Sequence, residues 1–265
     1  MSHILIATDL SEPAMHAALY AWEIFGPTNS YVMLHTYVQD PMLLGKYDEV
    51  EKAIRTGFED YAERFIRTTG SDGVQRQVRI GQVASVLEEV VAKRAADVVV
   101  MGNRGKAGST LFFGSNTVQV IQSSTVPVLA IPELAEIKRP KRILLATDHG
   151  DLEARTLDMV HQIALSCDAE VLIGHVQAME SQDPPVLDKH MFEQALNGVP
   201  HSYQQVRADD LLEGMDRIAR REGADMIAVV HRHAGFLGRL LHPSASKAIA
   251  ERINLPLLVL QQIAH

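Results

Sequence analysis

The most informative part of the sequence is Asp97-Val98-Val99-Val100-Met101-Gly102-Asn103-Arg104-Gly105, followed by Gly114-Ser115-Asn116-Thr117. An apolar run ends on a glycine, a glycine-bearing loop follows, and another glycine opens a segment with helical character. This order is typical of a parallel strand that leads into a helix N-terminus, where backbone N–H groups and the helix dipole favour an anion. Glycine permits the sharp turn and a close approach to a ligand. A plain strand–loop–helix connection is the alternative, since such a loop is not specific by itself.

Length and composition limit the possible classes of protein. The chain has 265 residues, enough for two ordinary domains or one large one, and a formal net charge of −8. That charge argues against nucleic acid as a partner. It permits a small nucleotide, for which Arg104 and Lys106 would supply local positive charge, with solvated loop cations as the alternative interpretation of both residues. No apolar run reaches the roughly 20 residues that span a bilayer.

Two further features bear on the compartment. The N-terminal sequence MSHILIATDL lacks a basic region and a cleavage site, so we expect no secretory signal and a cytoplasmic protein. Cys167 is the single cysteine, so an internal disulfide is excluded. We expect it to be a small buried residue rather than a reactive thiol.

The chain contains one pattern twice. Three segments of the first half return in the second half in the same order: 3–9 as 142–148, 97–100 as 225–230, and 126–131 as 255–260. We therefore predict two homologous domains, 1–135 and 140–265, joined by a segment of charges and prolines from Glu133 to Pro140.

Apolar periodicity predicts alternating strands and helices in each half, which is typical of a parallel sheet covered on both faces. The predicted strands lie at 4–8, 31–38, 75–80, 97–101, 126–131, 143–147, 170–175, 204–206, 225–230 and 255–260. The predicted helices follow Ser11 and Pro13, begin near Val50, Val83, Gly114, Leu152 and Leu211, and leave 177–185 as a loop. In such sheets, ligands bind beyond the carboxyl ends of the strands where the strand order reverses. Asp9 and the glycine loop both fall at such ends.

These residues resemble the universal stress protein family. The resemblance rests on Ala-Thr-Asp after the first strand of each half, Met101-Gly-Asn-Arg-Gly, and Gly114-Ser-Asn-Thr, and it covers nearly the whole chain in tandem form. It implies a Rossmann-like α/β fold, with two doubly wound domains of five parallel strands each. It also implies a Gly-x2-Gly-x9-Gly-Ser/Thr signature that binds the phosphates of ATP, with Mg²⁺ accompanying them.

The resemblance implies an ATP site in the first half. The glycines, Ser115 and Thr117 match phosphate and ribose contacts, Asp9 with its two predecessors matches contacts to base and ribose, and Thr36 falls where the family has a small apolar residue against adenine. The complete set is Ala7, Thr8, Asp9, Thr36, Met101, Gly102, Asn103, Arg104, Gly105, Gly114, Ser115, Asn116 and Thr117. One departure concerns the spacing, because Lys106 to Phe113 is eight residues instead of nine. This leaves the placement of Gly114 against the phosphates open.

The second half departs further from the family pattern. Val230-His231-Arg232-His233 replaces Met-Gly-x-x-Gly, and Pro243-Ser244 replaces Gly-Ser. Proline has no N–H to offer a phosphate. We expect this half to be structural and to bind no ATP in the family manner. The resemblance implies that the last strand of each domain pairs across a dimer axis. Here the two halves can pair within one chain, and a homodimer stays open.

Other chemistries leave weaker signals. His231, His233 and His242 suggest zinc or copper, Arg232 and Arg239 suggest an anion, and polar loop histidines are the alternative. The Gly-x-Ser-x-Gly, His-Glu-x-x-His and Gly-x4-Gly-Lys-Ser/Thr motifs are missing, so we assign no catalytic residue. Our leading hypothesis is an ATP-binding stress regulator with an unknown protein partner. The alternatives are a scaffold without nucleotide and a slow ATPase.

Overall fold

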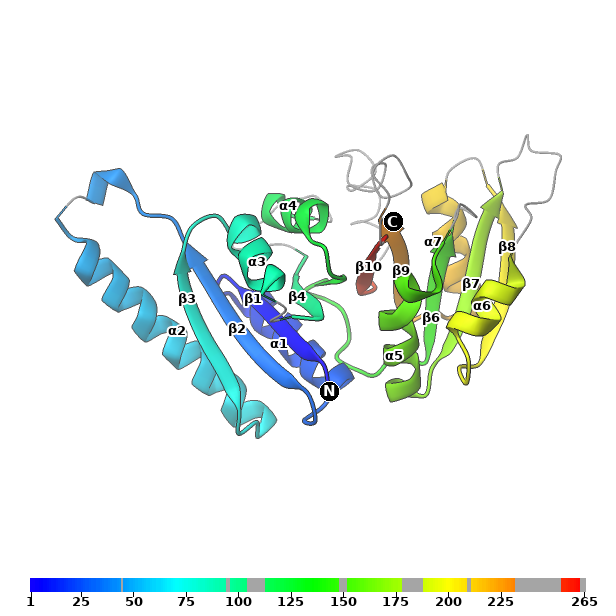
Figure 1. The fold of residues 1–265 in the computed structure, drawn as a ribbon, viewed down its shortest axis with the longest axis horizontal. Helices are drawn as coiled ribbons and strands as arrows, with labels where there is room; N and C mark the ends of the chain where they lie inside the picture. The colour runs from blue at the N-terminus through cyan, green and yellow to red at the C-terminus, as the bar shows by residue number, and fades with distance from the viewer. Residues whose placement is uncertain are drawn as a thin grey trace. The chain divides into compact units, whose positions relative to one another are not determined.

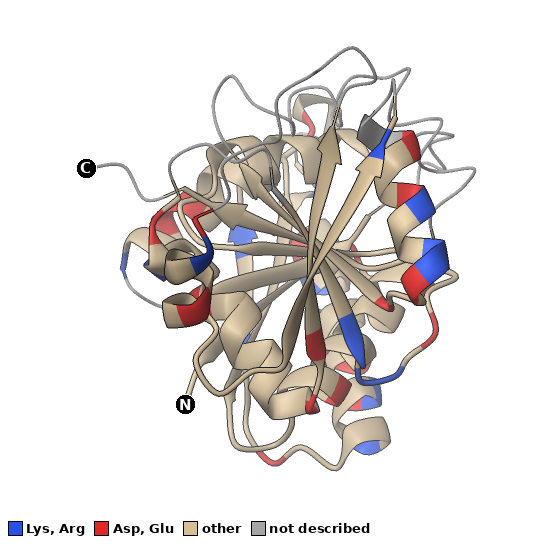
Figure 2. Cartoon of the chain, turned by 90° about the vertical axis from the view of Figure 1, so that its right-hand side faces the viewer, with Lys and Arg blue, Asp and Glu red and all other residues tan. Residues whose placement is uncertain are grey.

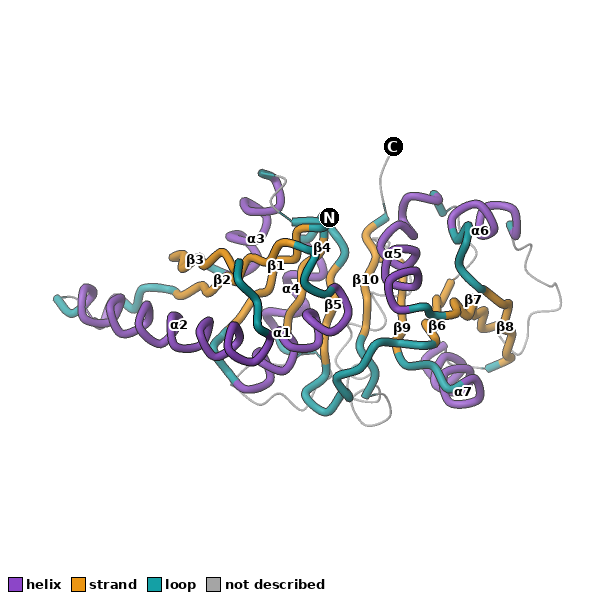
Figure 3. The backbone as a smooth tube through the Cα atoms, turned by 90° about the horizontal axis from the view of Figure 1, so that it is seen from below, coloured by secondary structure: helices purple, strands orange, loops and turns teal. Residues whose placement is uncertain are grey.

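The structure is a computed structural model that describes residues 1–43, 45–93, 96–103, 113–147, 152–177, 188–208, 211–231 and 254–262. The chain forms two compact units that divide between Glu133 and Leu134. In each unit, helices cover both faces of a parallel sheet (Figures 1 and 3). The described residues of each unit contribute five strands. The predicted fold class, tandem doubly wound α/β domains, is confirmed.

The first unit has the strand order β3-β2-β1-β4-β5, and its described neighbours are all parallel. The order reverses between β1 and β4. α1 contacts α2 on one face, and α3 contacts α4 on the other (Figure 3). The elements are β1 (His3–Thr8), α1 (Glu12–Phe25), β2 (Ser30–Tyr37), the 3₁₀ turn η1 (Pro41–Leu43), α2 (Tyr47–Thr69), β3 (Val74–Ile80), α3 (Val83–Ala92), β4 (Val98–Gly102), α4 (Ser115–Ser123) and β5 (Val128–Ile131).

The second unit repeats this arrangement with the order β10-β9-β6-β7-β8. Its elements are β6 (Arg142–Thr147), η2 (Ala154–Leu157), α5 (Asp158–Cys167), β7 (Glu170–Gln177), α6 (Lys189–Ala195), β8 (His201–Arg207), α7 (Leu211–Glu222), β9 (Met226–His231) and β10 (Leu257–Gln261). The helix predicted to begin near Leu152 begins only at Asp158, because the 3₁₀ turn η2 comes before it. Most of the predicted loop at 177–185 lies outside the described residues.

An aspartate fixes the central strand in both units. The Asp97 carboxylate accepts from the His3 N–H at 2.8 Å, and the Asp97 N–H donates to the His3 carbonyl. In the second unit, the Asp225 carboxylate accepts from the Arg142 N–H at 3.1 Å, and the Asp225 N–H donates to the Arg142 carbonyl. The same polar contact therefore sets the register of the first strand against the central strand in each repeat.

Apolar side chains from both faces of each sheet form the core. The strands are tan along most of their length in Figure 2, and charged residues gather on the helices and at strand ends. In the first unit, Trp22 lies against Tyr31 and Phe65, with ring centroids 5.1 and 6.0 Å away. In the second unit, Cys167 is 2% exposed, as expected for a buried residue. No helix of the described residues is long and apolar enough to cross a membrane.

Helix α2 is unusual in how its burial is distributed. Its buried residues are Phe58, Tyr61, Ala62 and Phe65, all in the C-terminal part of a helix of 23 residues. The N-terminal part extends away from the sheet (Figure 1). The C-terminal part therefore anchors α2 to the rest of the unit.

Candidate functional site

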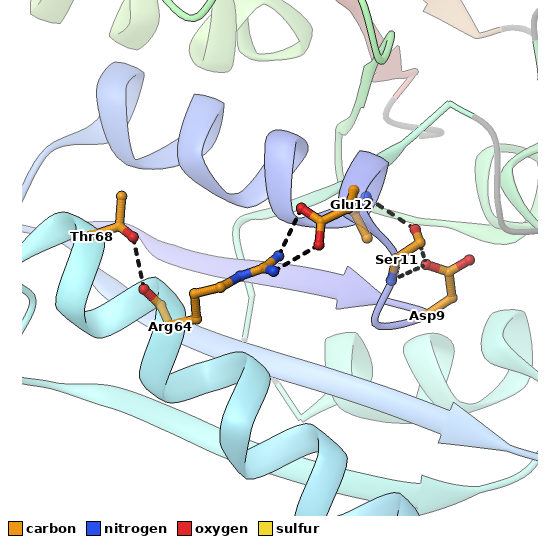
Figure 4. A network of polar contacts seen from close by, with 6 residues as sticks. Asp9, Ser11, Glu12, Arg64 and Thr68 are labelled. Carbon is orange, nitrogen blue, oxygen red and sulfur yellow. Dashed lines mark hydrogen bonds and ion pairs between the residues drawn. The ribbon is translucent and has the colours of Figure 1, made fainter.

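The chain turns sharply where β1 ends. Thr8 is buried, and its hydroxyl accepts from the Leu10 N–H at 3.0 Å. The Asp9 carboxylate accepts from the backbone N–H of Ser11 at 3.1 Å and also from its hydroxyl (Figure 4). The Ser11 side chain caps α1 by accepting from the Ala14 N–H at 3.2 Å. These contacts orient the Asp9 carboxylate at the carboxyl edge of the sheet.

The end of β2 lies beside the end of β1. The register pairs Thr8 with His35, whose Nδ1 donates to the Thr8 carbonyl at 2.8 Å. The His35 ring stacks on Phe58 of α2, with centroids 6.2 Å apart. Because side chains alternate along a strand, Thr36 points to the opposite face of the sheet. Sequence reasoning named Thr36 and missed His35, which supports the strand end from the α2 side.

The end of β4 closes the glycine loop. The Asn103 N–H donates to the Ile131 carbonyl at 2.9 Å, and the Asn103 carbonyl accepts from the Gly114 N–H at 2.8 Å. The Thr117 hydroxyl lies 3.2 Å from the Gly102 carbonyl and 3.3 Å from the Asn103 carbonyl. The two ends of the loop are therefore joined at the base of α4. Arg104, Gly105 and Lys106 lie outside the described residues.

The N-terminus of α4 has no side-chain cap among the described residues. Gly114 is the N-cap, in an extended conformation with φ −70°. Ser115 and Asn116 are exposed, whereas Thr117 is buried and directs its hydroxyl to the strand end. The first amides of a helix have no intrahelical acceptor. This end of α4 can therefore accept an anionic ligand.

The predicted site residues of β1 and β4 lie side by side. The register pairs Ile6 with Val100, so its continuation places Ala7 beside Met101 and Thr8 beside Gly102. Ala7 and Met101 are both buried. Asp9 and α4 thus follow neighbouring strands at the point where the strand order reverses, which is where such sheets bind ligands.

Two hollows in the described surface lie away from the ends of β1 and β4. One of about 580 Å³ is lined by residues of α2 between Asp48 and Asp60, and it is an open helix surface. The other, about 70 Å³, lies between the end of β2 and the N-terminal part of α2. Neither includes a predicted site residue.

Phe113, directly before the N-cap of α4, is 1% exposed, so its side chain is part of the core.

The second unit carries a side chain where the first has none. Counted from the aspartate that fixes each central strand, Val230 of β9 takes the place of Gly102, and it pairs with Leu260 as Gly102 pairs with Ile131. His231 follows in the place of Asn103, one residue later than the sequence comparison expected, and pairs with Gln261. The His231 Nδ1 lies 2.9 Å from the Gln261 side-chain oxygen. Among the described residues, no three His, Cys, Asp or Glu side chains gather as metal ligands. The remaining residues predicted for this end lie outside the described part: Asp148, Arg232, His233, Arg239, His242, Pro243 and Ser244.

The fold and the strand-end geometry define a tandem doubly wound α/β protein. The model of the universal stress protein family matches residues 1–132 and 140–261. The chain therefore belongs to the universal stress protein family and contains two copies of its domain.

Individual proteins are similar to part or all of this chain. Universal stress protein G of Salmonella typhimurium is 41% identical over 54 residues, which is 20% of this chain and only 38% of that relative. A universal stress protein from Archaeoglobus fulgidus is 20% identical over 98% of this chain and 96% of its own, with a TM-score of 0.71. At that identity, the likeness shows the fold. A universal stress protein solved in complex with cAMP is 20% identical over 48% of this chain and 94% of its own, with a TM-score of 0.39.

Proposed function

We propose that the first half binds ATP together with Mg²⁺, and that the protein acts as a nucleotide-responsive stress regulator. The observation that carries this proposal is the N-terminus of α4. It lacks a side-chain cap among the described residues and is joined to the end of β4 through Asn103 and Thr117. An N-terminus placed at the carboxyl edge of a parallel sheet favours phosphate oxygens.

The site residues divide by the part of the ligand they would hold. The amides at the start of α4 would receive the phosphates, with Gly114 allowing close approach and the exposed Ser115 and Asn116 adding donors. The Asp9 carboxylate, oriented by Ser11, would accept from ribose hydroxyls or help hold Mg²⁺. The adenine would lie near Thr36 and the strand ends. Arg104 and Gly105 belong to the same proposal.

Regulation follows if ATP favours one conformation of the protein over another, because a ligand shifts an equilibrium only by its differential affinity. We propose no ATP in the second half, because the Val230 side chain stands where the first half has Gly102, and the His231 imidazole follows in the place of Asn103. We also assign no catalytic base, because the expected role of Asp9 is to hold the ligand. Any ATP hydrolysis would be slow and incidental.

Calorimetry with ATP and Mg²⁺ tests this proposal. We expect binding in the micromolar range, roughly −8 kcal/mol, and at least a tenfold loss of affinity in Gly114→Val and Asp9→Ala. At a φ of −70°, valine is unstrained at position 114, so its effect reports a blocked approach to the helix. Gln119→Ala, on the exposed side of α4, should bind like the wild type.

The alternatives predict other results. If no adenine nucleotide produces heat, and purified protein releases none on denaturation by mass spectrometry, the protein is an interaction scaffold. Phosphate release above background that Asp9→Ala and Gly114→Val abolish would instead show an ATPase.

A further inference from the structure

One face of α2 lies against the connection between β1 and α1. Gly57, Tyr61 and Arg64 are spaced by four and three residues, so they share this face. The connection comprises residues 8–12, and each of the three α2 residues lies near a different part of it. The face therefore spans the turn that carries Asp9.

Gly57 lies near the strained residue of the turn. Leu10 has a φ of +64°, a left-handed conformation that residues other than glycine, asparagine and aspartate rarely adopt. A Cβ placed on Gly57 would lie 4.0 Å from Leu10 Cδ1. Such a conformation persists only where the surrounding structure holds it. Helix α2 leaves room for the Leu10 side chain at Gly57, which has no side chain of its own.

Arg64 holds the other end of the connection. Its guanidinium forms a bidentate pair with the Glu12 carboxylate, with N–O distances of 2.7 and 3.0 Å (Figure 4). Glu12 follows Ser11, whose N–H and hydroxyl bind Asp9. The pair is largely exposed, so its contribution to stability is small. Its two parallel hydrogen bonds do fix the direction in which Glu12 lies.

Tyr61 lies behind Thr8 and Asp9. It is 6% exposed, and its hydroxyl lies close to the Thr8 side chain without forming a hydrogen bond of ordinary geometry. Burial raises the pKa of Tyr61 and outweighs the lowering effect of the Thr8 side chain, so the hydroxyl stays protonated as a donor. An unpaired buried hydroxyl destabilises the folded state, and phenylalanine would fill the same space without that penalty. The Tyr61 hydroxyl is therefore placed to support the Thr8 end of β1.

We propose that Gly57, Tyr61 and Arg64 form a positioning face that holds the Asp9–Glu12 turn in the geometry that binds ligand. Arg64 fixes the turn through Glu12, and the Tyr61 hydroxyl supports the Thr8–Asp9 end of β1 when the site is occupied. This inference rests on the proposed function, since it concerns the same nucleotide site. It adds α2 residues that do not touch the ligand themselves.

Hydrogen exchange tests the positioning face without ligand. The Leu10 and Ser11 amides report the turn, because they donate to Thr8 and Asp9. Arg64→Ala should speed their exchange about threefold or more, as expected for the loss of one ion pair. Arg67→Ala, an exposed charge on the last turn of α2, is the matched control and should leave the rates unchanged. The reversed pair Glu12→Arg with Arg64→Glu should restore slow exchange.

Tyr61→Phe tests the hydroxyl. We expect about fivefold weaker ATP binding by calorimetry, as for the loss of one hydrogen bond, without a fall in melting temperature. A merely structural tyrosine would change both quantities or neither. Unchanged exchange in Arg64→Ala, or unchanged affinity in Tyr61→Phe, overturns the positioning face. A wild-type protein that binds no adenine nucleotide overturns the proposed function instead, and the exchange rates then decide the positioning face alone.

Discussion

Ser11 combines two tasks where β1 meets α1. Its hydroxyl accepts from the Ala14 N–H as the helix cap and also donates to Asp9. Ser11→Ala should lower the free energy of unfolding by about 1 kcal/mol, the usual loss for a serine cap. Urea denaturation followed by circular dichroism measures this change. Ser123→Ala, in the last turn of α4 and capping no helix, should have little effect.

The same variant separates folding from binding. Because Ser11 orients the Asp9 carboxylate, Ser11→Ala should also weaken ATP binding, whereas Ser123→Ala should not. Equal stability of Ser11→Ala and wild type would contradict the assignment of Ser11 as the cap.

Some residues of the site could be predicted from the sequence and others could not. Ser11 was predictable as a cap because serine before an apolar helical stripe is a known start signal. The left-handed Leu10 gave no signal, since that conformation normally selects glycine or asparagine. The inward hydroxyl of Thr117 was also unforeseen, because its partners are carbonyls of β4, distant along the chain. Roles that depend on tertiary neighbours do not show in local sequence.

At the scale of elements, two helical glycines should respond oppositely to the same change. Gly57→Ala in α2 should raise the free energy of unfolding by about 0.5 to 1 kcal/mol, because alanine favours the helix and its Cβ meets only an ordinary contact with Leu10. Gly214→Ala in α7 should destabilise, because its Cβ would lie 2.4 Å from a methyl group of Val176 on β7. Overpacking of this kind costs about 1 to 3 kcal/mol.

Melting temperatures of the two variants, compared with wild type, measure these effects. A stabilised Gly214→Ala would mean that α7 can move away from β7. A destabilised Gly57→Ala would mean that α2 lies closer to the turn than the structure shows.

The strands were predictable because buried parallel strands are continuous apolar runs with β-branched residues. The ends of the strands were less predictable. Strand β5 begins at Val128 rather than Val126, because Val126 and Ser124 form a hydrogen-bonded turn. The short helix α6 was missed. Its start is marked by Asp188, whose side chain accepts from the Met191 N–H at 3.1 Å. A helix of seven residues is too short to show a clear periodicity of apolar residues.

For the whole molecule, the internal repeat predicted the tandem organisation. Matching segments in matching order required two copies of one fold, and both the structure and the family match agree. The bounds 1–135 and 140–265, the pairing of the last strands and a homodimer stay predictions. Apolar residues on the last strand of each domain indicate that the strand is buried, but they do not show whether the other domain or a second chain covers it.

Each unit contains a natural reporter that the other lacks. Trp22, the single tryptophan of the chain, lies in the aromatic cluster of the first unit, and Cys167, the single cysteine, is buried in the second. Tryptophan fluorescence therefore follows melting of the first unit, and the rate of labelling by a thiol reagent follows opening of the second.

These reporters allow the two units to be followed separately without engineered labels. At ATP concentrations about a hundredfold above Kd, ligand linkage should stabilise the fluorescence transition by about 2.7 kcal/mol. If the units unfold independently, thiol labelling should keep its rate. A labelling rate that slows in step with the fluorescence shift would reveal energetic coupling, so one untagged sample can tell whether a signal received by one repeat reaches the other.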